Sequence, residues 1–489
     1  MKEKYLGYLR QNRKKIGISI VILLFLISMG ITVLHIIQSN SSLTPSNKTV
    51  YVTGDGSGNF TCDKSNDQVE INQALAYVAE NPQFSTVHLK GPNTYVISDS
   101  ILIGSDTILE GDATAVIKLK NNADWPGSKP LITQIDSAGI HGVTIKGFEI
   151  NGNHDNNDDR KKGEGYYNMI HFLNSTNIKV HDMYMHNGHG DGLRVERSSN
   201  IQFYNNKVYK LGHDGFYAID CQIMEAWNNK ITCRTNSGLR IWNSNHVKFH
   251  DNVINSFYHW SAGGPGILIQ KTTGVVNDVD VYNNTIHNTY GPGVWLIGYG
   301  ESYSNEEAQN VHIHHNIFYN TGTNPSIDWV GGIVSSGFYD TLVENNVFDG
   351  VYHAAIIQMY PPTSTGLEDS IDLSPQGTGY KTIVRNNIIV NTQKRTKDPD
   401  ETGYAVINYL PETHTFVLEN NCLYDNVGGN YRNANSTTDI YVDPLFVNQS
   451  KHDYHLKPNS PCTGVGYTLS TTSKGPRENT SQINIGRYS

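Results

Sequence analysis

Charged residues and cysteine are both scarce in this 489-residue chain. Charged residues make up 17% of it, against about a quarter in an average globular domain. Five cysteines without a Cys-x-x-Cys pair exclude a disulfide scaffold. The 45 glycines and 29 tyrosines exclude collagen, a coiled coil and a disordered polyelectrolyte, and they favour an all-β protein with many turns.

Basic residues are also in deficit, because 37 Lys and Arg face 46 Asp and Glu, a net charge of −9. The first fifteen residues contain six basic residues and one acidic residue, a net charge of +5, which leaves −14 for the remainder. Affinity for nucleic acid comes from basic groups that meet phosphates. We therefore expect no nucleic-acid partner.

One segment, residues 16–38, contains no Asp, Glu, Lys or Arg and is long enough to cross a bilayer as a helix. The basic residues before it should remain in the cytoplasm. This pattern predicts a cytoplasmic tail (1–15), a transmembrane signal anchor (16–38), a linker (39–49) and an extracellular domain (50–489). The protein would then be a single-pass protein of the cell membrane. A cleaved signal peptide, which would make it secreted, is the alternative.

A repeat of 23 residues runs through the middle of the chain. Lines written from Asn177, Asn200, Ile223 and His246 each show three short alternating apolar runs separated by turn residues. Three strands per turn at this period predict a parallel β-helix, with coils over about residues 86–450. One position in each turn is an asparagine whose amide is expected to hydrogen-bond along the axis: Asn206, Asn229, Asn252, Asn284, Asn316, Asn346, Asn387 and Asn421.

Both ends of the coil need cover. Apolar residues at helical spacing predict a capping helix over about residues 67–80, with Asn66 or Asp67 as its N-cap. A helix there would protect the open edge of the first rung. The segment 451–489 is expected to close the other end.

The opening TYVISDSILIGSDTILEGD and the ending DPLFVNQSKHDYHLKPNSPC resemble the pectate-lyase-like superfamily, which implies a single-stranded, right-handed β-helix. Within residues 263–360, GPGVWLIGYG, NVHIHHNIFYNTGTN, WVGGIVSSGF and TLVENNVFDGVYHAAI are similar to the archaeal disaggregatases. Those enzymes depolymerise a chondroitin-like matrix of uronic acid and N-acetylhexosamine. The resemblance implies a depolymerase of acidic surface polysaccharide.

The third strand of each turn predicts an outward face rich in Arg, Tyr and Trp. Side chains 23 residues apart become neighbours on adjacent rungs, and aromatic faces and guanidinium groups suit sugar rings and uronate carboxylates. We expect an exposed binding patch on this face, although ladder stacking is the alternative. The candidate substrate-binding residues are His189, Arg194, Tyr217, Arg240, Trp242, Trp260, Gln270, Lys271 and Trp295.

The turn that enters this strand gathers titratable residues, and its motifs resemble the Asp-rich motifs of polygalacturonases. Asp191 and Asp214 lie one period apart, and His213 precedes Asp214. Two neighbouring carboxyls suit glycoside hydrolysis, with the acid and base roles divided between them. We expect Asp214 to be an exposed turn carboxylate. In the alternative, a lyase, His213, Tyr217 or Lys271 removes the proton beside a uronate carboxylate that an Arg or Ca²⁺ neutralises.

Metal ligation has little support in the sequence. Residues 151–165 contain Asp155, Asp158 and Asp159, whose oxygens suit Ca²⁺, but a solvated loop is the plainer interpretation. His312 and His314 share a strand face without a third ligand, and we interpret them as a stacked ladder. The prediction is an enzyme that requires no cofactor, with Ca²⁺ as an alternative. A non-catalytic, glycan-binding adhesin remains the second function class.

Overall fold

The computed structural model describes residues 48–157, 167–233, 236–256, 264–298, 307–325, 327, 330–359, 380–466 and 485–486. Packing divides the chain into two compact units, Met1–Thr49 and Val50–Ser489. Strands dominate the second unit, as the composition predicts. Its described residues include the helix α2 (Gln68–Glu80) and the short 3-10 turns η1 (His154–Asn156) and η2 (Gln449–Lys451).

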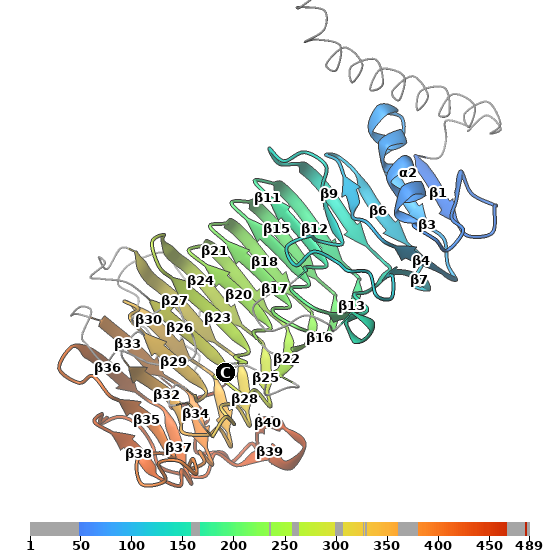
Figure 1. The fold of residues 1–489 in the computed structure, drawn as a ribbon. Helices are drawn as coiled ribbons and strands as arrows, with labels where there is room; N and C mark the ends of the chain where they lie inside the picture. Colours follow the sequence, from blue (N-terminus) through green and yellow to red (C-terminus); the bar gives the residue numbers. More distant parts are fainter. Residues whose placement is uncertain are drawn as a thin grey trace, which may run out of the picture. The chain divides into compact units, whose positions relative to one another are not determined.

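Three parallel sheets run along the second unit, and successive turns of the chain add one strand to each (Figure 1). In the described part of the chain, the first sheet has the order β2 (Phe60–Thr61), β1 (Thr49–Thr53), β3 (Thr86–Leu89), β6 (Ile108–Gly111), β9 (His141–Lys146), β12 (Thr176–His181), β15 (Ser199–Tyr204), β18 (Gln222–Trp227), β21 (Asn245–His250), β24 (Val276–Tyr282), β27 (Ala308–His314), β30 (Thr341–Glu344), β33 (Tyr380–Arg385) and β36 (His414–Glu419).

The second and third sheets follow the first in each turn. The second sheet contains β4 (Asn93–Ile97), β7 (Ala115–Leu119), β10 (Glu149–Asn151), β13 (Tyr184–Gly188), β16 (Lys207–Leu211), β19 (Lys230–Cys233), β22 (Val253–Ser256), β25 (Thr285–His287), β28 (Ile317–Tyr319), β31 (Val347–Asp349), β34 (Ile388–Val390) and β37 (Cys422–Tyr424). The third sheet contains β5 (Ile101–Ile103), β8 (Ile132–Gln134), β11 (Ile170–Leu173), β14 (Leu193–Glu196), β17 (Phe216–Ile219), β20 (Leu239–Trp242), β23 (Ile267–Lys271), β26 (Val294–Gly298), β29 (Ile333–Ser336), β32 (Ala354–Met359), β35 (Tyr404–Asn408) and β38 (Gly429–Arg432).

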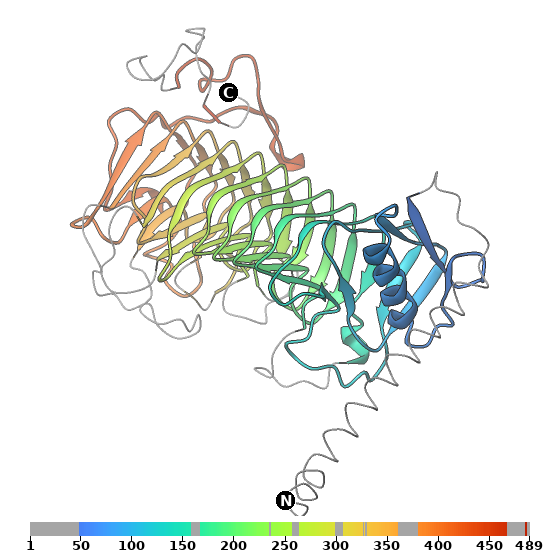
Figure 2. The ribbon, with the colours of Figure 1, turned by 90° about the horizontal axis from the view of Figure 1, so that it is seen from above.

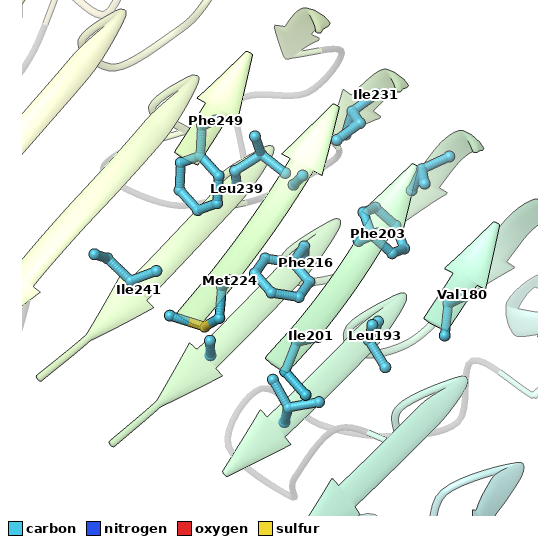
Figure 3. Close-up of a cluster of buried hydrophobic side chains, with 14 of the residues drawn as sticks. Val180, Leu193, Ile201, Phe203, Phe216, Met224, Ile231, Leu239, Ile241 and Phe249 are labelled. Carbon is cyan, nitrogen blue, oxygen red and sulfur yellow. The ribbon is translucent and has the colours of Figure 1, made fainter. Parts of the chain in front are cut away.

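The 23-residue register is confirmed in the regular turns. Ile178 pairs with Ile201, Ile201 with Met224, and Met224 with Val247. Alternate side chains of each strand therefore stack inside the coil as a continuous apolar core, which Figure 3 shows around Phe203. The inserted loops lengthen later turns without changing which strands pair. This constancy lets the sequence period predict which side chains are neighbours.

The asparagine ladder between the first and second sheets is also confirmed. Asn206 Nδ2 donates to Asn229 Oδ1 at 3.0 Å, and Asn229 Nδ2 donates to Asn252 Oδ1 at 2.9 Å. The same bond recurs through all eight predicted positions, each of which is buried. The residue before each ladder member has a left-handed backbone, which asparagine tolerates better than most residues. Six of these eight residues are asparagine, and Asp251 and His315 occupy the other two places.

The capping helix forms as predicted. Helix α2 buries Ile71, Ala74, Leu75 and Val78 against the first turn of the coil. Asp67 is the N-cap, but its carboxylate does not bond to the helix. Instead it accepts backbone hydrogen bonds from the neighbouring turn and from the second sheet, because these N–H groups would otherwise lack a partner: Asp63 N (3.1 Å), Lys64 N (2.8 Å) and Val96 N (2.6 Å).

The C-terminal segment serves two purposes. Asp439 continues the asparagine ladder by accepting from Asn421 Nδ2 at 3.1 Å. Beyond it, the antiparallel strands β39 (Phe446–Asn448) and β40 (Asp453–Leu456) turn back beside the coil (Figure 2). There Tyr454 donates to Asp349 Oδ2 at 3.0 Å on the outer face of the second sheet. This segment therefore covers the side of the last turns as well as extending their end.

In the described part of the chain, no helix combines the length and the apolar character needed to span a bilayer. The predicted anchor, residues 16–38, lies outside the described residues. Its membrane topology stays a prediction.

Candidate active site

A ladder of polar side chains occupies the turn between the second and third sheets. Each side chain accepts a hydrogen bond from the backbone N–H of the residue one rung further along. Asn168 Oδ1 accepts from Asp191 N at 2.9 Å, and Asp191 Oδ1 accepts from Asp214 N at 2.9 Å. Asp214 Oδ1 then accepts from Ser237 N at 2.8 Å. Asp191 and Asp214 are therefore one rung apart, as the period predicts.

Both carboxylates are buried within this ladder. Asp191 is 1% exposed and Asp214 is 0% exposed. The expectation of an exposed carboxylate at Asp214 is wrong, because its Oδ1 lies against the backbone of the next rung. Each aspartate uses Oδ1 for the ladder; in Asp214 the other oxygen, Oδ2, meets side chains, whereas in Asp191 Oδ1 also meets the ring of His213.

The imidazole of His213 lies between the two carboxylates. Its Nδ1 is 2.6 Å from Asp191 Oδ1 and 3.1 Å from Asp214 Oδ2. Its Nε2 is 3.1 Å from the side-chain amide of Asn236, which is able to turn either its oxygen or its nitrogen to the ring. The side chain of His213 is 23% exposed, so it is the member of this cluster that reaches water.

The two carboxylates set the charge of this ring. Burial alone would lower the pKa of His213, but Asp191 and Asp214 raise it to about 10. The ring is therefore an imidazolium at neutral pH. Burial would conversely raise the pKa of Asp214, yet His213 and Arg240 outweigh burial and lower it. The cluster consists of two carboxylates that share one protonated ring.

An Arg–Tyr–Arg stack stands beside this cluster on the third sheet. Arg194 pairs in register with Tyr217, and Tyr217 pairs with Arg240. The guanidinium carbons lie 5.0 Å and 4.3 Å from the centre of the tyrosine ring, within range of cation–π attraction. Burial raises the pKa of Tyr217, so its hydroxyl keeps its proton at neutral pH.

The two arginines differ in exposure. Arg240 is 5% exposed and is fixed by Asp214 Oδ2 at 3.3 Å and by Gln270 Oε1 at 2.7 Å. The side chain of Arg194 is 28% exposed, and its Nε donates to Glu196 Oε1 at 2.7 Å. Arg194 is therefore the guanidinium that a ligand in solution is able to reach, while Arg240 holds Asp214 in place.

Glu196 and His171 belong to the same site, although the sequence analysis did not select them. His171 pairs with Arg194 one rung earlier, and its Nε2 lies 3.2 Å from Glu196 Oε1. The contact with His171, with the charge of Arg194, lowers the pKa of Glu196 to about 2 in spite of its burial. The register contained the signal, because Glu196 is two residues after Arg194 on the same strand face.

Several predicted substrate contacts are engaged elsewhere in the structure. Lys271 is 3% exposed, and its Nζ lies 2.8 Å from Glu307 Oε2. Gln270 is 2% exposed and accepts from Arg240. Trp242 is half-buried, and its Nε1 donates to Thr272 Oγ1 at 2.7 Å. Of these three, Trp242 is the side chain with surface left for a sugar.

The expectation of an exposed patch is wrong from the second rung on, where Tyr217 is 3% exposed, Arg240 is 5% exposed and Trp242 is half-buried. Trp295 is 2% exposed in a second apolar cluster with Leu268 and Val334. On the later rungs the outward side chains of the third sheet that pair in register with Trp295 are apolar. They pack against one another and do not face water. His189 is 7% exposed and stacks on a neighbouring ring at 5.3 Å, that of Tyr167. Trp260 lies outside the described residues.

The same cluster has donor atoms close enough to consider a metal. One donor atom each of Asp191, His213 and Asp214 lies within 4.8 Å of the others. However, His213 Nδ1 already bridges the two carboxylates, so the donor set fits a shared proton. The calcium prediction concerned another loop, where Asp158 and Asp159 lie outside the described residues. It stays a prediction.

The residues of this site are able to donate a proton next to a positively charged side chain. An imidazolium that is held by buried carboxylates is a fixed general acid. Arg194 adds a guanidinium at the surface, which suits a carboxylate-bearing ligand. The ionised carboxylate of Glu196, whose side chain is 16% exposed, is the acceptor in the site that reaches water. The arrangement is suited to cleaving a bond next to an anionic group.

Two family descriptions match the chain. The right-handed beta helix region matches residues 37–254 and 168–348, which together cover more than half of the chain. A family described as disaggregatase related matches residues 276–474. No curated protein is significantly similar to the chain in sequence.

Solved structures show the same fold. A mannuronan C-5 epimerase A-module from Azotobacter vinelandii is 17% identical, with 77% of this chain and 94% of that chain covered at a TM-score of 0.50. A family 28 exopolygalacturonase from Yersinia enterocolitica is 13% identical, with 80% and 78% covered at a TM-score of 0.50. These likenesses concern the fold, and they agree with the family matches. The chain therefore belongs to the right-handed β-helix family and carries a disaggregatase-related region in its C-terminal part.

Proposed function

We propose that the chain is an extracellular depolymerase that cleaves an acidic polysaccharide of uronic acid and N-acetylhexosamine, with its reaction centre at Asp191, His213 and Asp214. The observation that carries the proposal is the imidazole of His213, fixed between two buried carboxylates beside the partly exposed Arg194. The disaggregatase-related match over residues 276–474 supports the choice of substrate class. The predicted signal anchor supports the location outside the cell.

Hydrolysis is the favoured reaction. In this proposal His213 donates a proton to the leaving glycosidic oxygen through Nε2, the nitrogen that the carboxylates do not hold. Asp191 and Asp214 keep that proton available instead of acting on the sugar themselves, since both are buried. Glu196 remains ionised and accepts the proton of the attacking water, while Arg194 binds the uronate carboxylate.

β-Elimination by a lyase is less well supported by these contacts. It needs a base that removes a proton next to the uronate carboxylate. His213 is protonated at neutral pH because its pKa is about 10, and burial keeps Tyr217 in its phenol form. Lys271 is paired with Glu307 at 2.8 Å. Each candidate base is therefore occupied, which favours hydrolysis.

The experiment is an incubation of the full-length chain with chondroitin-like polymers, followed by size analysis and ultraviolet absorbance of the products. We expect shortened chains without new ultraviolet absorbance. An unsaturated, absorbing uronate would instead identify a lyase. Failure to shorten any uronate-containing polymer would favour the adhesin.

A matched pair of variants locates the reaction. His213→Asn should remove most turnover. His246→Asn is the control, because His246 forms a comparable pair with Asp278, at 2.8 Å. This pair lies on an exposed part of the first sheet, so turnover should stay unchanged. Equal losses in both variants would contradict the assigned centre.

A further inference from the structure

Four titratable side chains meet on the outer face of the first sheet, well separated in sequence from the proposed reaction centre. Asp280 of β24 pairs in register with His312 of β27, and His314 of β27 pairs with Glu344 of β30. His312 and His314 are alternate residues of one strand, so both point outward. The parallel register thus supplies the third ligand that the sequence analysis did not find.

The donor atoms converge at metal-site distances. One donor atom each of Asp280, His312 and His314 lies within 4.8 Å of the others. Asp280 Oδ1 is 2.8 Å from His314 Nε2 and 3.8 Å from His312 Nδ1. Zinc bonds of about 2.0–2.1 Å place tetrahedral ligands about 3.3 Å apart. The two observed distances lie on either side of that value, so only small side-chain shifts are needed.

An outer carboxylate orients His312 for ligation. Glu344 Oε1 is 2.9 Å from His312 Nε2, and Arg385 Nε donates to Glu344 Oε2 at 2.6 Å. A carboxylate that is paired with a guanidinium accepts hydrogen bonds. His312 Nε2 therefore carries the proton, and the lone pair is on Nδ1, toward Asp280. Metal-binding histidines commonly have this carboxylate behind them.

His314 has the complementary arrangement. Its Nδ1 is 2.7 Å from His315 Nδ1, a contact that requires a proton between the two rings. His314 Nε2 donates to Asp280 Oδ1 at 2.8 Å, so His315 Nδ1 supplies that proton, and ligation through Nε2 requires the other tautomer, with the proton on His314 Nδ1. Lys248 pairs with Asp280 from the preceding rung, but the ion pairs of the described residues do not include one between them. Asp280 therefore faces two imidazole nitrogens.

Other histidines on this face do not converge in this way. His250 contacts Glu225 and Asp251, at 3.1 Å and 2.7 Å, as a single imidazole. Stacking does not set it apart, because His314 also stacks on its ring neighbours, as the predicted ladder requires, and its ring centre lies 4.0 Å from that of His312. One imidazole with carboxylates is explained as an ordinary ion pair. Asp280 Oδ1, by contrast, has imidazole nitrogens of two residues near it, His314 Nε2 at hydrogen-bond distance (2.8 Å) and His312 Nδ1 further away (3.8 Å).

We infer that Asp280, His312 and His314 form a binding site for one divalent transition-metal ion of the zinc type, with a fourth position left for water or an anionic ligand. Nitrogen donors favour zinc over calcium, which takes oxygen ligands. Asp280 also lines a pocket of about 260 Å³ together with Glu225, Lys248 and Asp278, but His312 and His314 are not among its lining residues. The inference is independent of the proposed function.

The test is binding of Zn²⁺ alone to the tag-free, full-length chain, measured by equilibrium dialysis with metal analysis and by calorimetry. We expect one tight site per chain. Asp280→Asn and His314→Asn should each weaken it by more than about 100-fold, and Glu344→Gln by about 10–100-fold. Co²⁺ in place of Zn²⁺ should give the intense visible absorption of a four-coordinate site.

Asp278→Asn is the matched control, because Asp278 lies on the same strand, two residues from Asp280, and is more exposed. It should leave Zn²⁺ affinity unchanged. The far-ultraviolet circular dichroism spectrum and melting temperature of each metal-free variant establish that it is folded. Absence of stoichiometric Zn²⁺ binding by the unaltered chain would overturn the inference, and so would equal loss in Asp278→Asn and Asp280→Asn.

Discussion

Two ladders run along this coil with the same backbone geometry and different charge. In the asparagine ladder, Asn229 and its neighbours each donate to one rung and accept from another, so every member is neutral and satisfied. In the ladder of the third-sheet turn, Asp191 and Asp214 accept the same kind of backbone bond but have no hydrogen to donate. The cations that meet their remaining lone pairs are His213 and Arg240 at Asp214 and His213 at Asp191.

Asp439, at the end of the asparagine ladder, shows that the cation decides the protonation state. Asp439 is 8% exposed and accepts from Asn421 and Tyr431, and burial raises its pKa. Asp214 is more deeply buried, yet His213 and Arg240 lower its pKa. A buried aspartate with neutral partners holds its proton more firmly. One that faces an imidazolium and a guanidinium stays ionised and keeps the proton on the ring.

The largest expected effect follows from making the charged ladder neutral. In Asp214→Asn, the amide oxygen still accepts from Ser237 N, but His213 loses one of the two charges that hold its proton. Turnover should fall by about 10²–10⁴-fold, the usual contribution of a general acid. Activity should recover partly at lower pH, where the ring is protonated again. Kinetics across pH check this, and near-unchanged activity at neutral pH would contradict the assigned role.

Interrupting the neutral ladder should affect stability and leave the chemistry intact. In Asn284→Ala, the amide N–H groups of Asn252 lose their buried acceptor, and the oxygen of Asn316 loses a donor. Each buried polar group left without a partner costs about 1–3 kcal/mol. We expect the free energy of unfolding to fall by about 3 kcal/mol or more, as measured by denaturant titration. Activity per folded molecule should stay at the level of the unaltered chain.

The two ladders should also differ in how their contribution to the free energy of unfolding changes with pH. The pKa of His213 rises from 6.5 in the unfolded chain to about 10 in the folded one. The stability that it contributes is therefore complete below pH 6.5 and is lost as the pH rises toward 10. The melting temperature should fall over this range, and the fall should be smaller in His213→Asn. Parallel curves for the two proteins would show that the ring is not protonated as argued.

The sequence predicted the coil because its 23-residue period is expressed in the regular turns that begin at Asn177, Asn200, Ile223 and His246. The pairing of Asp191 with Asp214, and of Arg194 with Tyr217 and Arg240, followed from spacing alone. Burial did not follow, because period-2 alternation separates the inner face of a strand from its outer face, but it does not show what covers the outer face. Trp295 was therefore placed at the surface, whereas it lies in a second apolar cluster.

The metal-type cluster was missed for a different reason. His312 and His314 lie two residues apart on one strand. Asp280 precedes His312 by 32 residues, and an insertion between them breaks the 23-residue spacing. Side chains from turns of unequal length become neighbours only when the strand pairing is known. Regular turns are thus readable from sequence, whereas sites that span an insertion need the structure.

The smallest effect is expected from Asp439→Asn. This variant compares the two ladders most directly, because it makes the same Asp→Asn change as Asp214→Asn, but in the asparagine ladder. Asp439 Oδ1 accepts from Asn421 N at 2.8 Å, and the asparagine oxygen of Asp439→Asn is able to accept the same bond. The change removes a carboxylate whose pKa burial raises, so no charge needs to be buried near neutral pH. The new amide hydrogen bonds to the hydroxyl oxygen of Tyr431, which now donates to water or to Tyr441.

We expect a change in the free energy of unfolding within about 1 kcal/mol, in the stabilising direction at neutral pH and absent at acidic pH, with full activity. A loss of activity like that of Asp214→Asn would mean that both ladders act in the reaction, whereas a large loss of stability would mean that Asp439 needs its charge to end the coil.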